Sequence, residues 1–340
     1  MKTKQSKAST ALKIDDNAKY FDGVVGQPRA KTELGFYLKN HIESGAVVPN
    51  LLFTGSKGDG KTHLARKFAR NLPDISNPSR KNKAFYSFNG GAILNPTILL
   101  EDILSKVQDQ HASIFVDECH MLPKKVQAVL LSILEPNRSH ITTYNFNDIE
   151  YRFDSRRLTF IFATTDAQGL LDPLKDRLTT LCLEMYGPEE LAKIIELTVD
   201  GRLSFDGNTL EELSKYVRRN ARNAVRVAEN ALSFNCPIFE THHLETLKEK
   251  LNLFPLGVTF NEIRALRILE RDGECSLGSL SCRLAQAASA VQKDVEPYLI
   301  ANRLMEINGL RRITATGRAY LKALGGCEEA KKDLQGGAVL

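Results

Sequence analysis

The chain has 340 residues, of which 42% are hydrophobic and 26% are charged, and its formal net charge is +5. This composition is ordinary for a soluble globular protein, and the length allows two or three domains with separate cores. No apolar run is long enough to cross a bilayer, and the polar start does not resemble a secretory signal, so we expect a cytoplasmic protein without membrane contact.

The six cysteines show no spacing typical of a zinc site or a disulfide framework. We therefore expect reduced thiols, with Cys119 and Cys182 buried as small hydrophobic side chains in apolar runs. The mild positive charge permits nucleic-acid binding without demonstrating it.

After a polar N-terminal arm at residues 1–20, the chain shows three successive patterns. Residues 21–186 alternate short apolar runs with helical stretches, which predicts a parallel α/β sheet. The expected strands are Asn50–Thr54, Ala84–Phe88, Ser113–Val116 and Leu158–Ala163. Residues 187–252 have helical spacing and predict a small helical domain, with helices at Glu189–Val199, Asn208–Arg219 and Ala224–Phe234.

Residues 258–325 carry the third pattern, and Leu251–Gly257 is the expected linker before it. Helices are expected near 260–271, 276–286 and 290–306, then a strand at Gly309–Thr314, a turn at Ala315–Gly317, and a closing helix or strand at Arg318–Leu324. Three helices followed by a small β element are the outline of a winged helix-turn-helix. The polar tail at 326–340 is expected to fray.

The segment GSKGDGKT at residues 55–62 has the spacing of a phosphate-binding P-loop, with an apolar strand before it and a helical pattern after it. Its glycines, including Gly55, Gly58 and Gly60, would let backbone N–H groups point at phosphate oxygens. Lys61 would bind the β- and γ-phosphates, and Thr62 would bind Mg²⁺. We therefore expect ATP and Mg²⁺ here, with His63 also beside the nucleotide.

Two further apolar strands end in residues suited to hydrolysis. Asp117 and Glu118 follow one strand, where Asp117 would help to hold Mg²⁺ and Glu118 would polarise the attacking water. The alternative is a strand that simply ends in surface acids. Thr165 follows the next strand and could orient the water, with Thr164 as second choice, although β-propensity alone also explains a β-branched residue at a strand end.

Two arginines complete the predicted catalytic set. Arg177 ends the segment PLKDR and lies too far around the domain to serve its own P-loop, so it would act in trans on a neighbour's γ-phosphate. The alternative is a surface ion pair with Asp172 or Asp176. Arg222 starts a helix of the small domain and could bend over the phosphates, although other arginines lie nearby.

This order of motifs resembles that of AAA+ ATPases, and within them the RuvB family of Holliday-junction branch-migration motors. The resemblance spans about residues 20 to 324 and implies a P-loop domain, a helical lid and a winged-helix DNA-binding domain. It also places Val25 near the adenine. Five stretches carry it: Val24–Pro28, Phe115–Leu122, Phe162–Thr165, Pro173–Arg177, and Val295–Ile300 with Gly309 and Leu310.

The chain also departs from the family pattern. Ser56, Lys57 and Asp59 stand where RuvB proteins have two prolines and an apolar residue. Lys175 replaces an arginine, and no arginine directly precedes Gly317. These departures indicate a distant member.

Residues 140–153 alternate polar and apolar side chains and predict a β-hairpin. The resemblance implies that such a hairpin docks a junction-binding partner protein, through exposed Tyr144, Phe146 and Ile149. A hairpin packed only on its own core is the alternative. Basic residues on the predicted wing and the preceding helix would bind DNA phosphates, unless the wing contacts protein instead: Arg303, Arg311, Arg312 and Arg318.

The resulting prediction is an ATPase that works as a homo-oligomeric ring, expected to be a hexamer, and moves duplex or junction DNA in recombination and repair. One alternative is a clamp loader or helicase loader, which shares the same nucleotide-site motifs. The other is a regulator whose nucleotide only controls assembly.

Overall fold

In this computed structural model, the structure describes residues 20–74, 82–107 and 109–336, with side chains as far as Gly325. The described chain forms two compact units. The first contains the residues up to Leu203 together with Arg219–Ser233, and the second contains Ser204–Arg218 and the chain from Phe234 onward. The expected N-terminal arm, apart from Tyr20, lies outside the described residues.

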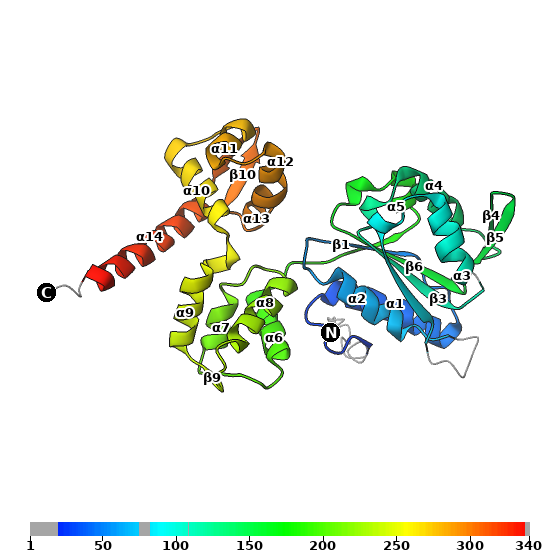
Figure 1. Cartoon of the computed structure of the whole chain (residues 1–340), viewed down its shortest axis with the longest axis horizontal. Helices are drawn as coiled ribbons and strands as arrows, with labels where there is room; N and C mark the ends of the chain where they lie inside the picture. The colour runs from blue at the N-terminus through cyan, green and yellow to red at the C-terminus, as the bar shows by residue number, and fades with distance from the viewer. Residues whose placement is uncertain (1–19, 75–81, 108, 337–340) are drawn as a thin grey trace, which may run out of the picture. The chain divides into compact units, whose positions relative to one another are not determined.

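The first unit is built on a five-stranded parallel sheet with the order β2-β3-β6-β1-β7 (Figure 1). The strands are β1 (Leu51–Thr54), β2 (Ala84–Asn89), β3 (Ala112–Asp117), β6 (Leu158–Thr164) and β7 (Thr179–Cys182). The four predicted strands are confirmed to within one residue at each end. The sequence prediction missed β7, whose short Thr-Thr-Leu-Cys run has little apolar signal.

Both faces of the sheet are covered, because side chains alternate between the faces along each strand. Leu51 and Phe53 pack with α1 (Pro28–Ser44) and α2 (Lys61–Asn71). Leu52 packs on the other face with α4 (Lys124–Ile133) and the π-helix η4 (Ile98–Leu104), which continues into α3 (Ser105–Val107). Figure 1 shows α1 and α2 together on one side of the strands. In a sheet covered on both faces, ligands bind outside the carboxyl ends of the strands.

The rest of the first unit consists of a hairpin, short helices and two longer helices. The hairpin pairs β4 (Ile141–Phe146) with β5 (Ile149–Asp154), which confirms that prediction. Tyr144 and Phe146 are half-buried against the core, so the expectation that both are exposed is wrong, whereas Ile149 is 51% exposed. The helices are η3 (Gly90–Ala92), η5 (Cys119–Met121), η6 (Ala167–Gly169), α5 (Asp172–Lys175), α6 (Pro188–Val199) and α8 (Ala221–Leu232).

The second unit begins with a small element of paired strands and helices. Strand β8 (Ser204–Phe205) pairs with β9 (Ile238–Phe239), a pairing that the sequence did not predict. Helix α7 (Thr209–Ser214) is shorter than the predicted 208–219 segment, because Lys215 and Tyr216 already form turns. Helix α9 (Thr241–Leu251) follows, and η7 (Pro255–Gly257) lies in the predicted linker.

The C-terminal part of the second unit has the winged-helix outline. Its helices α10 (Phe260–Asp272), α11 (Leu277–Leu284), α12 (Ala288–Ala290), η8 (Val291–Val295) and α13 (Glu296–Ala301) precede the antiparallel wing of β10 (Met305–Asn308) and β11 (Leu310–Ile313). Helix α14 (Ala315–Gly336) follows. These elements share one apolar core that includes Leu266, Leu280, Leu299 and Ile313.

Two boundary predictions in this part are wrong. The helix expected at 290–306 ends at Ala301, because Arg303 takes a left-handed backbone conformation (φ 58°) before β10. The turn expected at Ala315–Gly317 is the first turn of α14, where the Thr314 hydroxyl accepts a hydrogen bond from the Gly317 N–H at 3.0 Å. The backbone after Gly325, where we expect fraying, is helical as far as Gly336.

The cysteine prediction is partly confirmed. The cysteines with described side chains are free: Cys119, Cys182, Cys236, Cys275 and Cys282. Cys119 is buried as expected, but Cys182 is exposed, because it ends the edge strand β7. Among the helices of the described residues, none has the length and apolar character needed to cross a membrane.

Candidate nucleotide site and nucleic-acid interface

The P-loop joins the carboxyl end of β1 to the start of α2. Gly58 and Gly60 take positive φ values of 93° and 88°, which side chains rarely adopt, so glycine is needed at both positions. Lys61 is 7% exposed, and its ammonium donates hydrogen bonds to the carbonyl oxygens of Gly55 and Ser56, each at 2.8 Å. Burial lowers the pKa of Lys61, and the carboxylate of Asp59 is the strongest opposing influence.

Thr62 and Asp117 meet beside this loop. The Thr62 hydroxyl donates to Asp117 Oδ2 at 2.7 Å, because α2 begins next to the carboxyl end of β3. A hydroxyl and a carboxylate are oxygen ligands suited to Mg²⁺, which takes its remaining ligands from phosphates and water. The two predicted metal ligands therefore fit such an ion.

Glu118 lies one residue further on and has an unusual backbone. Its φ of 50° is in the left-handed region, where residues other than glycine are uncommon and often functional. The Thr165 hydroxyl donates to Glu118 Oε2 at 3.3 Å. Thr164 is fully buried and binds His120 Nδ1 at 2.9 Å, while the same nitrogen lies 3.4 Å from Glu118 Oε2. Thr165 is therefore placed to contact a ligand, and Thr164 holds a histidine behind Glu118.

A cavity of about 520 Å³ brings these groups together within the first unit. Its walls contain most residues predicted to bind or hydrolyse nucleotide: Val25, Gly58, Gly60, Lys61, Thr62, His63, Asp117, Glu118, Thr165 and Arg222. Gly55 does not line the cavity, and takes part through its carbonyl contact with Lys61. Burial lowers the pKa of His63, and the charges of Lys67 and Arg70 act in the same direction.

Several residues of the cavity wall were not predicted individually, although Gln27 belongs to the stretch Val24–Pro28 that the resemblance places near the adenine. Gln27 accepts a hydrogen bond from the Glu184 N–H at 2.9 Å and donates to its carbonyl at 2.7 Å, which ties the segment before α1 to the end of β7. The Tyr186 hydroxyl donates to the Asp59 carbonyl at 3.1 Å. Ile194, Leu197 and Thr198 of α6, with Val225 of α8, add a mainly apolar wall. The apolar spacing of these helices signals burial but not which cavity they line.

Arg222 approaches the P-loop from α8. Asn220 caps this helix by accepting a hydrogen bond from the Asn223 N–H at 2.9 Å, which confirms the predicted helix start. The backbone N–H of Arg222 itself lies 3.4 Å from the Gly58 carbonyl oxygen. This places the Arg222 side chain on the cavity wall.

Arg177 lies near the amino ends of the strands, at the opposite end of the sheet from the P-loop. It precedes β7, whose first residue pairs with Leu51 at the amino end of β1, whereas the P-loop follows the carboxyl end of β1. Arg177 lines a second cavity, of about 300 Å³, which shares no lining residue with the nucleotide cavity. Its Nη2 atom is 4.0 Å from Glu135 Oε1, and among the described residues it is this acid, rather than Asp172 or Asp176, that pairs with Arg177.

Comparison with known proteins agrees with this geometry. Residues 17–183 match the family model of the Holliday junction DNA helicase RuvB P-loop domain. The Holliday junction branch migration complex subunit RuvB of Campylobacter lari is 27% identical over 304 residues, which cover 87% of each chain. The RuvB subunit of Phytoplasma mali is 28% identical over 286 residues, covering 81% of this chain and 83% of that one. Residues 17–183 therefore form a RuvB-like P-loop domain, and the chain is similar to RuvB over most of its length.

Solved structures show the same fold. The Thermotoga maritima RuvB Holliday junction branch migration motor superposes with a TM-score of 0.69 over 88% of this chain and 95% of that one, at 23% sequence identity. A point mutant of the same Thermotoga protein gives a TM-score of 0.71 over 89% of this chain and 97% of that one, also at 23% identity. The α/β P-loop domain with helical and winged-helix C-terminal parts is therefore the RuvB architecture.

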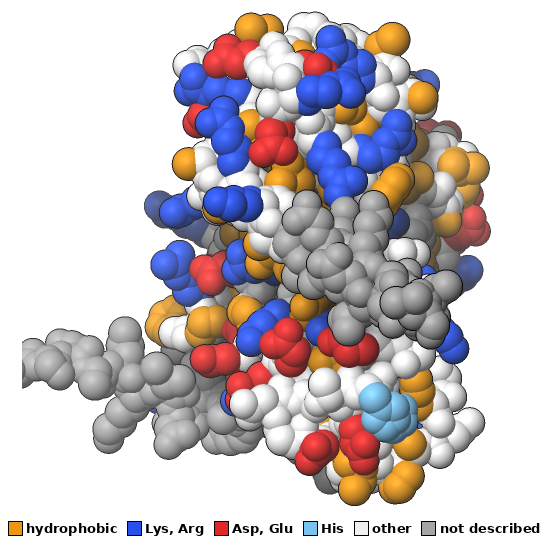
Figure 2. Space-filling model, turned by 90° about the vertical axis from the view of Figure 1, so that its left-hand side faces the viewer, with side chains coloured by type: hydrophobic (Ala, Val, Ile, Leu, Met, Phe, Trp, Pro, Cys, Tyr) orange, Lys and Arg blue, Asp and Glu red, His pale blue; other side chains and the backbone are white. Residues whose placement is uncertain are grey.

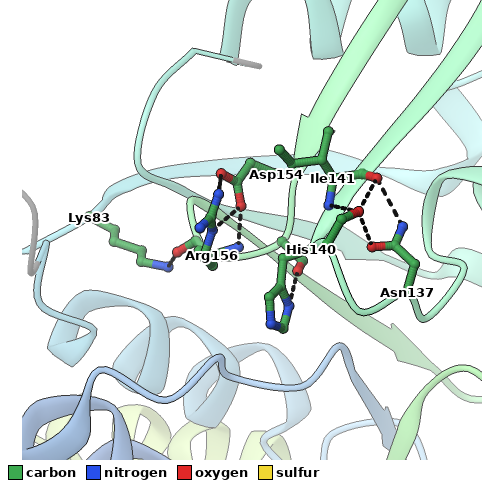
Figure 3. A network of polar contacts seen from close by, with 8 residues as sticks. Lys83, Asn137, His140, Ile141, Asp154 and Arg156 are labelled. Carbon is green, nitrogen blue, oxygen red and sulfur yellow. Dashed lines mark hydrogen bonds and ion pairs between the residues drawn. The ribbon is translucent and has the colours of Figure 1, made fainter.

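A network of polar contacts holds the base of the β4–β5 hairpin (Figure 3). The Arg156 side chain donates to Asp154 at 2.6 Å, and the Lys83 ammonium lies 3.3 Å from the Arg156 carbonyl. His140 accepts through its carbonyl from the Ser155 N–H at 2.9 Å, which closes the two hairpin strands. The base residues of both strands also line the cavity that contains Arg177.

The predicted DNA-binding arginines differ in their surroundings. Arg311 is largely buried in an ion pair with Glu296 at 2.8 Å, and Arg312 binds Glu306 at 2.6 Å. Arg303 and Arg318 are exposed. The sequence pattern did not reveal the acids that pair with the wing. On the face of the molecule shown in Figure 2, Lys and Arg side chains are intermixed with Asp and Glu.

Proposed function

We propose that this chain is an ATP-driven motor that moves duplex DNA during Holliday-junction branch migration, in recombination and repair. The observation that carries the proposal is the separation of Arg177 from the nucleotide cavity within a complete RuvB-like P-loop domain. The RuvB subunits of the relatives are named as parts of a branch migration complex.

In the proposed mechanism, Lys61 leaves the carbonyls of Gly55 and Ser56 to bind the β- and γ-phosphates of ATP. Thr62 and Asp117, already in contact, would hold Mg²⁺. When bound, this ion would neutralise charge on the phosphate oxygens. Arg222 would reach the phosphates from α8, so that nucleotide binding bears directly on the α6–α8 pair.

Glu118 would accept the proton of the attacking water, since its carboxylate lies on the cavity wall beyond Asp117. The Thr165 hydroxyl, 3.3 Å from that carboxylate, would orient the same water. His120 contacts both Glu118 and buried Thr164, and so would fix the direction of the carboxylate. This arrangement supports turnover, and not only nucleotide binding.

Arg177 requires a neighbouring copy. Arg177 lies where the strands of the sheet begin. A second subunit that stacks its nucleotide cavity against this end of the sheet would therefore receive the guanidinium. Repetition of this contact gives a closed ring, for which we propose six subunits. In the proposal, the ring works in the cytoplasm and the β4–β5 hairpin docks a junction-binding partner through exposed Ile149.

Exposed Arg303 and Arg318, with Arg312, would contact DNA phosphates from the winged-helix part. Arg312 would exchange Glu306 for a phosphate, whereas Arg311 would stay with Glu296 and support the wing. Phosphate contacts carry no sequence information, which suits a protein that must move along any duplex.

A branch-migration assay on a synthetic four-way junction tests the proposal. The wild-type chain with ATP, and with the junction-binding protein where needed, should separate the junction into two duplexes. A Glu118→Gln variant should bind ATP and assemble, but should neither hydrolyse ATP nor move the junction. Hydrolysis without junction movement, combined with nucleotide-dependent delivery of another protein to DNA, would instead establish a loader. The winged-helix part makes that alternative the less favoured one.

A further inference from the structure

Asp59 occupies an unusual position inside the P-loop. It is 2% exposed, and its Oδ2 atom accepts a hydrogen bond from the Ser56 backbone N–H at 2.6 Å. The Asp59 N–H in turn lies 3.3 Å from the Ser56 carbonyl. These two contacts close the first part of the loop into a small ring. A proline at position 56 could not donate the first of them, because proline has no N–H.

The same short segment also holds Lys61. The carbonyls of Gly55 and Ser56 accept hydrogen bonds from the Lys61 ammonium, while the Ser56 N–H is taken by Asp59. A buried ammonium is costly without a nearby opposite charge. Asp59 is the strongest of the carboxylates that keep Lys61 protonated. The Asp59 carboxylate and the Lys61 ammonium therefore both bind the backbone of the same short segment, Gly55 and Ser56.

One oxygen of Asp59 is not satisfied. The Oδ1 atom is buried and has no hydrogen-bond partner among the described residues. A buried carboxylate oxygen without a donor is costly, so this position would not be occupied by an acid for packing alone. A Cβ added at Gly55 would lie 3.3 Å from Asp59 Oδ2, so the carboxylate packs closely against the loop backbone.

We propose that Asp59 is a positioning residue of the nucleotide site: it braces the P-loop through Ser56 and supplies the counter-charge of Lys61 until nucleotide phosphates replace it. This inference rests on the proposed binding of ATP. It explains together two departures from the RuvB pattern, Ser56 and Asp59, which form the donor and the acceptor of one hydrogen bond.

The proposal makes nucleotide binding depend on the charge of Asp59. Burial raises the pKa of Asp59 to about 6, against the effects of the Ser56 N–H and of Lys61. Phosphates that approach Lys61 repel an ionised carboxylate beside it, so they bind better when Asp59 is protonated. Affinity should therefore fall as the pH rises through this value. Asp59 acts on two neighbouring residues, Lys61 and Tyr186. Lys61 also feels the charges of Asp117, Glu118 and Arg222, and Tyr186 also feels the charge of Glu190.

Asp59→Asn is the decisive variant, because an amide oxygen can still accept from the Ser56 N–H but carries no charge. Binding of Mg²⁺-ATP to the full-length wild type and to Asp59→Asn is measured between pH 5 and pH 7.5 by titration with a fluorescent ATP analogue. We expect equal affinities at pH 5 and about fivefold tighter binding by Asp59→Asn at pH 7.5, from the removed like-charge repulsion. Changes in the protonation of ATP or His63 affect both proteins and cancel in the ratio.

The brace is tested without nucleotide. Ser56→Pro removes the N–H and Asp59→Leu removes the carboxylate, and thermal unfolding of both single variants and of the double variant is recorded. The double variant should lose less stability than the sum of the single losses, since each substitution destroys the same hydrogen bond.

The outcomes distinguish a failure of the proposed role of Asp59 from a failure of the proposed ATP binding. An affinity ratio that does not change with pH, or strictly additive effects of the two substitutions, overturns the role of Asp59. A wild-type protein that binds no ATP at any pH overturns the proposed function itself.

Discussion

The contact between Arg218 and Glu262 in the second unit is an ion pair with a fully buried acid. Glu262 is fully buried at the start of α10, and its two carboxylate oxygens accept hydrogen bonds from Arg218 at 3.0 Å each. Glu262 also accepts from the Thr259 N–H at 2.7 Å, which caps the helix. The guanidinium lies 3.5 Å from the centre of the Tyr298 ring. One arginine thus ties the turn after α7 to α10 and α13.

The Arg218→Met substitution should be strongly destabilising, because it leaves the Glu262 carboxylate buried without its cation. Removing one partner of a buried ion pair costs about 3–5 kcal/mol. The Arg218 side chain is 23% exposed, so water can partly replace it and we take the lower end, about 3 kcal/mol. Loss of the contact with Tyr298 adds about 1 kcal/mol. We therefore expect a loss of about 3–4 kcal/mol in the free energy of unfolding of this unit.

Hydrogen–deuterium exchange of backbone amides, read by mass spectrometry, localises the effect to α10 (Phe260–Asp272). The matched control is Lys215→Met, which removes an exposed pair with Glu212 at 3.0 Å and should cost about 0.5 kcal/mol or less. In Arg218→Met, the amides of α10 should exchange several hundredfold faster, a factor that corresponds to about 3–4 kcal/mol. Equal protection of α10 in the two variants would show that the Arg218–Glu262 pair does not stabilise this helix.

Three further predictions concern other parts of the chain. Arg177→Ala subunits should hydrolyse ATP slowly by themselves and should lower turnover when mixed with wild type, since each lacks the group it gives to a neighbour; full activity with no effect on mixing contradicts the ring. The pKa of Lys83 is lowered to about 8 by burial, against Asp74 and Asp154. The unfolded chain therefore binds the proton that the folded chain has lost. The unfolding free energy of wild type minus that of Lys83→Met should rise by about 2.5 kcal/mol from pH 8 to pH 10.5 in denaturant titrations, and a constant difference contradicts this assignment. Arg318→Ala should weaken duplex binding and make it less salt-dependent, by about one unit in the slope of log affinity against log salt, and an unchanged slope would remove Arg318 from the interface.

The strands and the nucleotide-binding residues were predictable from local patterns. Apolar runs such as Ser113–Val116 signal strands buried on both faces, and the spacing of Gly55, Gly60 and Lys61 specifies a phosphate-binding loop wherever a strand precedes it and a helix follows. Because parallel strands end at one edge of a sheet, the position of Asp117 at the end of its strand was enough to place it beside Thr62.

Contacts between segments distant in sequence were not predictable. The pairing of Arg311 with Glu296, and the half-burial of Tyr144 and Phe146, depend on which elements pack together. The early end of the helix after Val295 depends on tertiary contacts too, since the residues up to Met305 have helical spacing but Met305 is buried in the wing.

Local patterns were enough to predict the P-loop, the acidic end of the strand at Ser113–Val116 and the position of Arg177 in the chain, because each of these features depends on neighbours within a few residues. The hydrogen bond between Asp59 and Ser56, and the choice of Thr165 over Thr164 as the contact of Glu118, emerged only from the folded unit. Such contacts depend on strand order and side-chain burial, which are settled by the packing of the whole unit, to which every segment contributes.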